Sequence, residues 1–422
     1  MSEMSTPGTT IRLTSNFSLS SLSMFKPELL APAGSLEKLK VAVLYGADAV
    51  FFSGQRYSLR ARADNFTEEE LKEGIAFAQR HGVKTYITLN AFLHDDDLEG
   101  LDEFCQLLDS LGVTAVIVSD LGVIDVIQKS SKLAVHLSTQ ASCLNAASAM
   151  FWKAQGVERI VLGREVSIQD AAEIKAASGL EMEMFIHGAM CMAYSGNCVI
   201  SNYTAGRDSN RGGCIQSCRF QYQQIDPKTG KTADSFFMSS KDMSGLQYIP
   251  EFCRAQIDSL KIEGRMKSLF YVASLCRAYR RALDLCTSGE ALSEELAALD
   301  AEINSVPHRD YFGASFTKPA GSLSVFQDRQ GTIRSGTHQF TGLVLEKTDK
   351  FAAVRLYAPM TEDQTIEILP FRGAPIPVHA TEVFDLLGNR LSSARQDCVV
   401  CIPLEEQLAH VEPLNIVRAQ RS

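Results

Sequence analysis

Four cysteines lie close together in the middle of the chain, in a stretch rich in glycine and small polar residues. They are Cys191, Cys198, Cys214 and Cys218, four of the eleven cysteines in the sequence. Buried structural cysteines usually follow an apolar periodicity, which these four lack, and glycine-rich loops of this kind can fold around an ion. The residue types and their spacing therefore indicate a cofactor site.

Spacing alone leaves three interpretations of this cluster open: an iron-sulfur cluster, structural zinc, or no ligand. Cys214 and Cys218 suit structural zinc, but the six residues between Cys191 and Cys198 make a loose first pair. Iron-sulfur clusters accept four thiolates at more varied spacings, although the pattern matches no common ferredoxin. Disulfides are disfavoured because no secretory signal opens the chain and the cysteine count is odd.

The other seven cysteines are expected to be buried hydrophobic residues. Cys398 and Cys401 imitate a metal-binding pair, but in a strand-like run positions three apart point to opposite faces. The rest fall in helical patterns: Cys105, Cys143, Cys253, Cys276 and Cys286.

Positive charge is concentrated around the cysteine cluster. The whole chain has a formal charge of −9, yet the segment 207–281 holds thirteen Lys and Arg against seven Asp and Glu. That segment is therefore +6 and the remainder −15, which favours an RNA or a small anionic substrate at the cluster. For Arg277, Arg280 and Arg281 a solvated helix surface is an equally good interpretation.

Length and composition are those of a globular protein with one large core and a smaller second one. The chain has 422 residues, of which 45% are hydrophobic and 22% charged. No apolar run approaches membrane-spanning length, so we expect a cytoplasmic protein that does not contact a membrane. Residues 1–23, rich in Ser and Thr, are expected to form a disordered N-terminal extension, and Met24 could itself be a translation start.

Residues 24–290 alternate short apolar runs with amphipathic helical patterns, which is typical of βα units around a parallel sheet. A helix over 67–80 opens with a capping box at Thr67 and Glu70 and closes at His81 and Gly82. Eight strands make a TIM-type (β/α)8 barrel of the α/β class the most economical fold, with an open doubly wound sheet as the alternative. The predicted strands are 28–33, 49–54, 84–89, 115–120, 134–139, 159–163, 181–188 and 258–264.

A barrel predicts where the active site lies, because such sites form at the carboxyl ends of the strands. Strand seven ends at His187 and runs directly into a Cys-rich insertion, the cluster at 191–218. Polar residues follow other strands and would converge on the same mouth, although each alone is more often a turn former or helix cap. These residues are Asn90, Asp120, Thr139, Gln140, Arg164, Glu165, Glu263 and Arg265.

Residues 291–422 are predicted to form a helical linker, to Asn304, followed by a small C-terminal all-β domain. Alternating runs occur at 340–345, 352–357, 365–369 and 399–404. Such a domain can bind RNA or a partner, or simply pack against the barrel. No P-loop or Gly-x-Gly-x-x-Gly fingerprint is found, so a classical nucleotide cofactor is not indicated.

Several motifs together make the chain resemble the peptidase U-32 family, also called collagenase-like. The strongest are Met-Phe-Ile-His-Gly-Ala-Met-Cys at 184–191, Ser-Gly-Asn-Cys at 195–198 and Asn-Arg-Gly-Gly-Cys at 210–214. Ser-Leu-Lys-Ile-Glu-Gly-Arg-Met-Lys-Ser at 259–268 and His-Leu-Ser-Thr-Gln-Ala at 136–141 also match. The resemblance extends from residue 28 to about residue 290.

The resemblance implies an iron-sulfur enzyme. Members of this family are understood to hold a cluster on four cysteines and to hydroxylate RNA bases or ubiquinone precursors without oxygen. By resemblance, Cys191, Cys198, Cys214 and Cys218 would hold a 4Fe-4S cluster, with prephenate as cosubstrate. The chain is most similar to the RNA branch, in which the wobble uridine of tRNA becomes 5-hydroxyuridine. A hydroxylase of ribosomal RNA or of a ubiquinone precursor is the alternative within the family.

Two other function classes compete with a hydroxylase. The family name suggests a peptidase, but neither a His-Glu-x-x-His helix nor a Gly-x-Ser-x-Gly elbow is found. A noncatalytic RNA-binding protein with structural zinc is the third possibility. The expected partners are tRNA and a small anionic cosubstrate, and the sequence identifies no protein partner.

The candidate site residues follow from charge and from position after the strands. His187 is a candidate general acid or base, and Glu263 and Arg265 are further catalytic candidates. Anion or substrate contacts are expected from Arg60, Arg62, Gln140, Arg211 and Lys261.

Overall fold

The computed structural model describes residues 24–58, 65–290, 292–327, 334–404 and 409–421. The predicted N-terminal extension and two candidate anion contacts, Arg60 and Arg62, lie outside the described residues. No described helix is long and apolar enough to cross a membrane.

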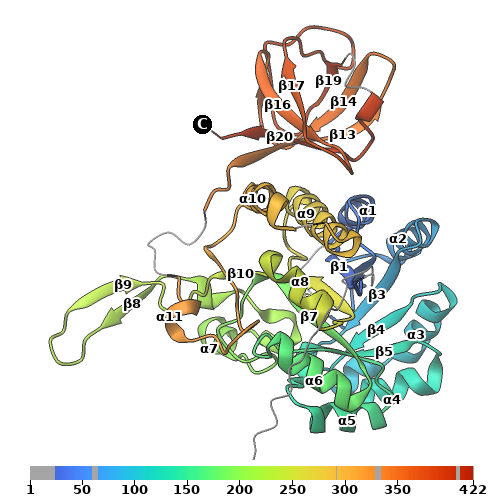
Figure 1. Ribbon diagram of the computed structural model, residues 1–422, viewed down its shortest axis with the longest axis vertical. Helices are drawn as coiled ribbons and strands as arrows, with labels where there is room; N and C mark the ends of the chain where they lie inside the picture. Colours follow the sequence, from blue (N-terminus) through green and yellow to red (C-terminus); the bar gives the residue numbers. More distant parts are fainter. Residues whose placement is uncertain (1–23, 59–64, 291, 328–333, 405–408, 422) are drawn as a thin grey trace, which may run out of the picture.

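Within the described residues, eight parallel strands close into a barrel surrounded by helices (Figure 1). Each strand pairs with the next along the chain, and the last one closes the ring on both sides. Lys261 lies opposite Leu30 of the first strand and opposite Phe185 of the seventh. This confirms the TIM-type barrel and excludes the open sheet. The strands are β1 (Glu28–Pro32), β2 (Ala49–Phe52), β3 (Lys84–Leu89), β4 (Ala115–Val118), β5 (Ala134–Leu137), β6 (Arg159–Val161), β7 (Glu181–Ala189) and β11 (Ser259–Ile262).

The helices that cover the barrel begin and end at residues suited to caps. Thr67 and Glu70 form the expected capping box on α2, and Gly82 follows its end with φ +69°. The helices around the strands are α1 (Leu36–Leu44), α2 (Glu68–Arg80), α3 (Leu101–Ser110), α4 (Leu121–Ser130), α5 (Ala146–Ala154), α6 (Ile168–Ser178), α8 (Ile249–Arg254) and α9 (Leu269–Ser288). Short helical turns lie between them at η1 (Asp95–Leu98), η2 (Thr139–Ala141) and η5 (Leu246–Tyr248).

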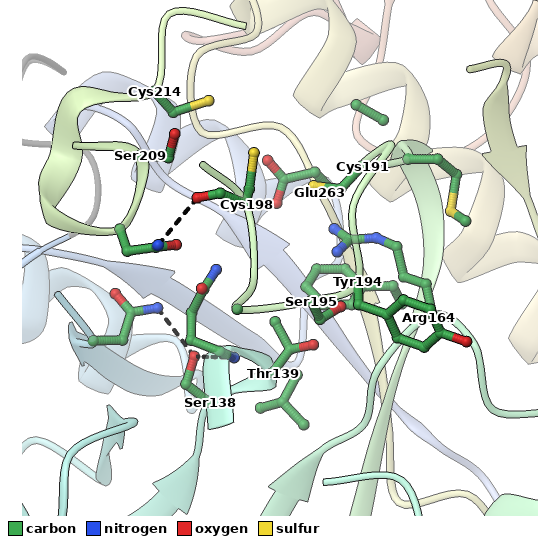
Figure 2. A pocket seen from close by; sticks show the side chains of 18 of the residues that line it. Ser138, Thr139, Arg164, Cys191, Tyr194, Ser195, Cys198, Ser209, Cys214 and Glu263 are labelled. Atoms are coloured by element: carbon green, nitrogen blue, oxygen red, sulfur yellow. Dashed lines mark hydrogen bonds between the residues drawn. The ribbon is translucent and has the colours of Figure 1, made fainter. Parts of the chain in front are cut away.

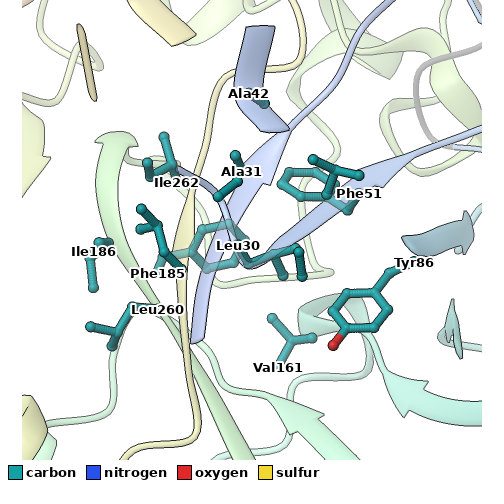
Figure 3. Close-up of a cluster of buried hydrophobic side chains, with 14 of the residues drawn as sticks. Leu30, Ala31, Ala42, Phe51, Tyr86, Val161, Phe185, Ile186, Leu260 and Ile262 are labelled. Atoms are coloured by element: carbon teal, nitrogen blue, oxygen red, sulfur yellow. The ribbon is translucent and has the colours of Figure 1, made fainter. Parts of the chain in front are cut away.

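The barrel core is apolar with one buried charge network at its centre. Leu30, Phe51 and Val161 belong to the apolar part, which Figure 3 shows together with residues of the surrounding layer. Glu183 is fully buried and accepts from Lys261 at 2.8 Å and from Arg159 at 3.4 Å. Because buried charges need partners, this network fixes the polar side chains inside the barrel.

The sheet continues beyond the barrel along β7. Strand β10 (Asp242–Ser244) runs antiparallel to β7, and β12 (Tyr311–Phe312) pairs with β10. A separate hairpin, β8 (Tyr222–Ile225) with β9 (Thr232–Ser235), projects from the body of the protein (Figure 1). The sequence analysis did not predict these strands, because segments of two to four residues carry too little periodicity.

The C-terminal region is a small antiparallel β domain, as expected, reached through the linker helices α10 (Leu292–Ile303) and α11 (Ser322–Val325). In its described residues six strands form one sheet in the order β17-β16-β20-β13-β14-β19. Two of them, β17 and β20, were not predicted. The strands are β13 (His338–Lys347), β14 (Phe351–Leu356), β16 (Gln364–Leu369), β17 (Ile376–Ala380), β19 (Val399–Pro403) and β20 (Ile416–Gln420), with a separate pair of β15 (Met360–Thr361) and β18 (Ser393–Ala394).

This β domain packs against helices of the barrel. The buried Tyr45 hydroxyl at the end of α1 donates to the Leu369 carbonyl at 2.7 Å and accepts from the Ile416 amide at 2.9 Å. Arg418 of β20 pairs with Glu302 of α10 at 3.1 Å. The β domain therefore contacts the outer helices, whereas the cysteines lie at the mouth of the barrel.

Candidate functional site

A cavity of ≈ 190 Å³ opens at the carboxyl ends of the barrel strands, where the sequence predicted the active site. All four clustered cysteines line it. In Figure 2 the Cys198 and Cys214 side chains lie on one side of the pocket, and Arg164 and Tyr194 lie across from them. Other lining residues include Gln140, Lys261, Glu263, Arg265 and Arg219.

The loop that carries the cysteines is built around buried serine hydroxyls. It holds one short helix, α7 (Ile200–Ala205), and two helical turns, η3 (Ser209–Gly213) and η4 (Ser217–Arg219). The Ser201 hydroxyl accepts from the Ile215 amide at 3.2 Å and lies 3.4 Å from the Ser217 hydroxyl. These bonds replace the apolar core that such a loop lacks, and they fix Ile215 and Ser217, the residues next to Cys214 and Cys218 in sequence.

The same loop is fixed to the barrel by close backbone contacts. A Cβ atom on Gly196, which has φ +83°, would lie 2.0 Å from the Gln140 carbonyl oxygen. Only glycine fits this position. The Asn210 side chain donates to the Cys198 carbonyl at 3.1 Å, and the Asn210 carbonyl accepts from the Phe92 amide at 3.0 Å.

Arg219 ties the two ends of the cysteine loop together. Its guanidinium donates to the Met190 carbonyl, to the Ser240 hydroxyl at 2.8 Å and to the Ser240 carbonyl at 3.0 Å. Met190 directly precedes Cys191, and Arg219 directly follows Cys218. The sequence analysis did not select Arg219, although its place beside the last cysteine was a usable signal.

The four thiols are close enough to influence one another. Burial raises the pKa of the Cys218 thiol, Arg219 opposes this effect, and Cys191, Cys214 and Cys198 add to it. All four are free thiols, at least partly exposed.

The thiols match an iron-sulfur cluster in type and number. Among the described residues, no three His, Cys, Asp or Glu side chains are arranged closely enough to hold a metal ion as they stand. Four free thiols on one glycine-rich cavity nevertheless form the donor set that a 4Fe-4S cluster requires. The residues therefore fit such a group in donor type and number.

Two predicted cationic residues reach the cavity from inside the barrel. Lys261 is buried, pairs with Glu183 at 2.8 Å and lies 4.3 Å from the centre of the Phe51 ring. Arg265 is also buried and donates to the hydroxyls of Ser58 and Thr88 at 3.0 and 3.2 Å. Both side chains are held in place by these contacts. They therefore suit a small anion bound in one position better than the flexible backbone of a nucleic acid.

Gln140 and Arg164 line the pocket with polar atoms that have no partner in the described part of the chain. These atoms are the buried Gln140 Oε1 and Arg164 Nε. The Arg164 guanidinium lies 3.9 Å from the centre of the Phe185 ring, a cation–π contact.

Of the remaining candidates, Glu263 lines the cavity, whereas Arg211 is not among its lining residues. Arg211 pairs with Asp97 at 2.8 Å and donates to the Phe92 carbonyl at 2.6 Å, so it fastens the loop after β3 to the cysteine loop. The Glu263 backbone is fixed by the His187 carbonyl and the Tyr271 hydroxyl.

His187 does not line the cavity. It is buried among Tyr271, Tyr279 and Tyr311, and its Nδ1 lies 3.1 Å from the Tyr279 hydroxyl. Burial lowers its pKa to about 3, so the ring is neutral at physiological pH. This position favours a structural role over acid–base chemistry at the pocket.

Two predictions about the other cysteines were wrong. Cys398 is exposed and precedes β19, so it is not a core residue; Cys401, within β19, is only partly buried. Cys143 is buried as expected, but it lies in the loop between η2 and α5 and not in a helix.

Comparison with known proteins identifies a family, and the relatives carry names that indicate different activities. The sequence profile of peptidase family U32 matches residues 34–322. A tRNA hydroxylation protein P1 of Bacillus subtilis is 41% identical over 407 residues, 93% of this chain and 94% of that protein. A 23S rRNA 5-hydroxycytidine C2501 synthase of Escherichia coli is 34% identical over 81% of this chain and 52% of its own length. A collagenase of Porphyromonas gingivalis is 31% identical over 68% and 72%.

Proposed function

The chain belongs to peptidase family U32, and from this we propose that it is an RNA hydroxylase that forms 5-hydroxyuridine at the wobble position of tRNA. The observation that carries the proposal is that four free cysteines line one pocket, with cationic side chains, at the carboxyl end of a barrel. A relative named as a tRNA hydroxylation protein aligns with almost the whole chain, which supports tRNA over ribosomal RNA.

In this proposal Cys191, Cys198, Cys214 and Cys218 hold a 4Fe-4S cluster. When bound, such a cluster would supply electron transfer, and its iron would act as a Lewis acid toward the oxygen of a cosubstrate. The protein's own contribution is to hold the four thiols in one loop at the pocket.

The reaction needs an oxygen donor. Hydroxylation replaces the C5–H bond of the base by C5–O–H and oxidises the base by two electrons. An oxygenated anionic cosubstrate, prephenate by resemblance, would lose the oxygen atom and take up the same two electrons, so that no further oxidant is needed. The buried cations Lys261 and Arg265 are our candidates to orient its carboxylates.

RNA would be held by the positive side of the molecule around the cysteine loop. Among the described residues, Arg207, Lys228, Lys231 and Lys241 form no ion pair, and the two lysines of the hairpin turn are exposed. By contrast, Arg277, Arg280 and Arg281 pair with carboxylates and are less suited to bind phosphate. Exposed cations supply the salt-dependent part of RNA affinity.

A peptidase is the second candidate, since the family name and the collagenase relative favour it. A cysteine protease requires a thiol and a histidine within hydrogen-bond reach. Among the described residues that line the pocket there is no histidine. This arrangement argues against the peptidase.

The first test is metal analysis of the protein purified without oxygen. We expect iron and acid-labile sulfide in the full chain, and their loss in Cys191→Ala. Cys398→Ala, which changes an exposed cysteine of the β domain, is the matched control and should retain both. Zinc without sulfide would contradict the proposal and favour a structural metal site.

A further inference from the structure

Two pocket residues, Gln140 and Arg164, present unsatisfied polar atoms of opposite kind. Gln140 Oε1 is an acceptor and Arg164 Nε–H is a donor, and both are buried without a partner among the described residues. Buried polar atoms are nearly always hydrogen-bonded, so this pair leaves one acceptor and one donor for a ligand or a water molecule at the cavity. Both residues line the same cavity as the four cysteines.

The chemistry of the pair limits the ligand. A carboxylate or a phosphodiester would satisfy Arg164 but would leave the Gln140 side-chain carbonyl unpaired, because these anions have no hydrogen to donate. The ligand must therefore carry donors and acceptors side by side. The edge of a pyrimidine base does so, since uracil has an N–H between two carbonyl oxygens.

The pocket also offers a flat surface at its entrance. Tyr194 lines the cavity and is 63% exposed, so one face of its ring is open to a ligand. Figure 2 shows Tyr194 beside Arg164, which itself rests on Phe185. Exposed aromatic rings next to a polar recognition group are the usual means of holding an unstacked base.

We propose that Gln140, Arg164 and Tyr194 form a pyrimidine subsite, which takes the target base after it has turned out of the RNA stack. Gln140 and Arg164 bind the polar edge of the base, and Tyr194 stacks on its face. This inference rests on the proposed RNA hydroxylase and assigns its substrate contacts. It places the base in the same cavity as the four thiols.

The test separates base recognition from RNA affinity and from the metal site. An RNA stem-loop with 4-thiouridine at the target position is photo-crosslinked to the anaerobically purified full chain, and the crosslinked peptides are mapped by mass spectrometry. We expect crosslinks at 138–140 or at Tyr194. Tyr194→Ala should reduce the yield several-fold, whereas Tyr203→Ala, which changes a ring that is 88% exposed on the same loop and does not line the pocket, should not.

Hydroxylated nucleoside is then measured for Gln140→Leu and Arg164→Met, beside the exposed control Arg254→Met. Loss of a polar base contact is expected to lower the product by about 10- to 100-fold. Iron content and stem-loop affinity should stay within about threefold, because phosphate contacts supply most of that affinity.

Two different failures can be told apart. If the wild-type chain hydroxylates RNA but crosslinks and product are unchanged in the pocket variants, the subsite is wrong and the proposed function stands. If the wild-type chain neither crosslinks nor hydroxylates RNA, the proposed function is wrong and the subsite with it. Tyr194→Ala keeps the test valid even if a buried substitution prevents folding, since Tyr194 is largely exposed.

Discussion

The Arg219 side chain donates a hydrogen bond to the carbonyl oxygen of Met190. Because Met190 directly precedes Cys191 and Arg219 directly follows Cys218, this contact joins the first and last cysteines of the cluster. Ser240, two residues before β10, accepts from the same guanidinium. One side chain thus closes the cysteine loop.

Arg219→Met is expected to weaken metal binding by about 10- to 100-fold, as loss of a residue supporting metal ligands usually does. The measurement is iron and sulfide per chain after anaerobic purification, with the visible absorption spectrum as a second readout. Arg219→Lys should retain part of the iron because a lysine can still donate to Met190. Arg254→Met is the surface control, and equal iron in all four proteins would show that Arg219 does not organise the loop.

Gly196→Ala should displace the cysteine loop. The new Cβ atom would meet the Gln140 carbonyl carbon and oxygen, and φ is +83° at this position. Gly230→Ala provides a matched control, because Gly230 also has a positive φ, +68°, but nothing lies within 4 Å of its added Cβ. Gly230→Ala should lower the free energy of unfolding only by the backbone strain, about 1–2 kcal/mol. This variant should keep its iron. Gly196→Ala should lose iron, measured per chain, and a variant that keeps it would contradict the tight contact.

The protein should lose stability in acid partly through His187. Burial lowers the folded-state pKa of His187 to about 3, below the ordinary value of 6.5. Between these values the unfolded chain binds a proton at this residue and the folded protein does not. The free energy of unfolding therefore falls as the pH is lowered from about 6.5 to about 3, with a slope of at most about 1.4 kcal/mol per pH unit from this group.

His187→Phe should flatten this pH dependence, as measured by chemical unfolding at several pH values. The aromatic replacement keeps contact with the surrounding tyrosines. Since His187 does not line the pocket, the iron content at neutral pH should stay that of the wild type. An unchanged slope would mean that His187 is not the buried neutral group described above.

The sequence predicted the barrel well because eight buried strands and their helices repeat one simple pattern. It also located the pocket, since parallel strands bring their carboxyl ends together and strand seven leads into Cys191. His187 was misleading: it follows the same rule of position, but its side chain turns toward Tyr279 outside the cavity. Residues such as Arg219 and Tyr194 acquire their roles from loop geometry, which no periodicity encodes.

The β domain should be held on the barrel by the Tyr45 hydroxyl. Tyr45→Phe would leave the Leu369 carbonyl and the Ile416 amide without this partner, at a cost of about 1–3 kcal/mol. Chemical unfolding of the full chain measures this loss. Tyr203→Phe, at an exposed ring, should change the free energy of unfolding by less than about 0.5 kcal/mol. Equal stability of the two variants would contradict the proposed role of Tyr45.

The most direct test of the central claim is mass spectrometry of tRNA nucleosides from a strain that lacks this protein and is complemented with different variants. We predict that 5-hydroxyuridine is restored by the wild type and by Cys398→Ala, and is absent with Cys191→Ala. If Cys191→Ala restores the nucleoside as fully as the wild type does, or if the wild type itself does not restore it, the account of a cysteine-dependent RNA hydroxylase is contradicted.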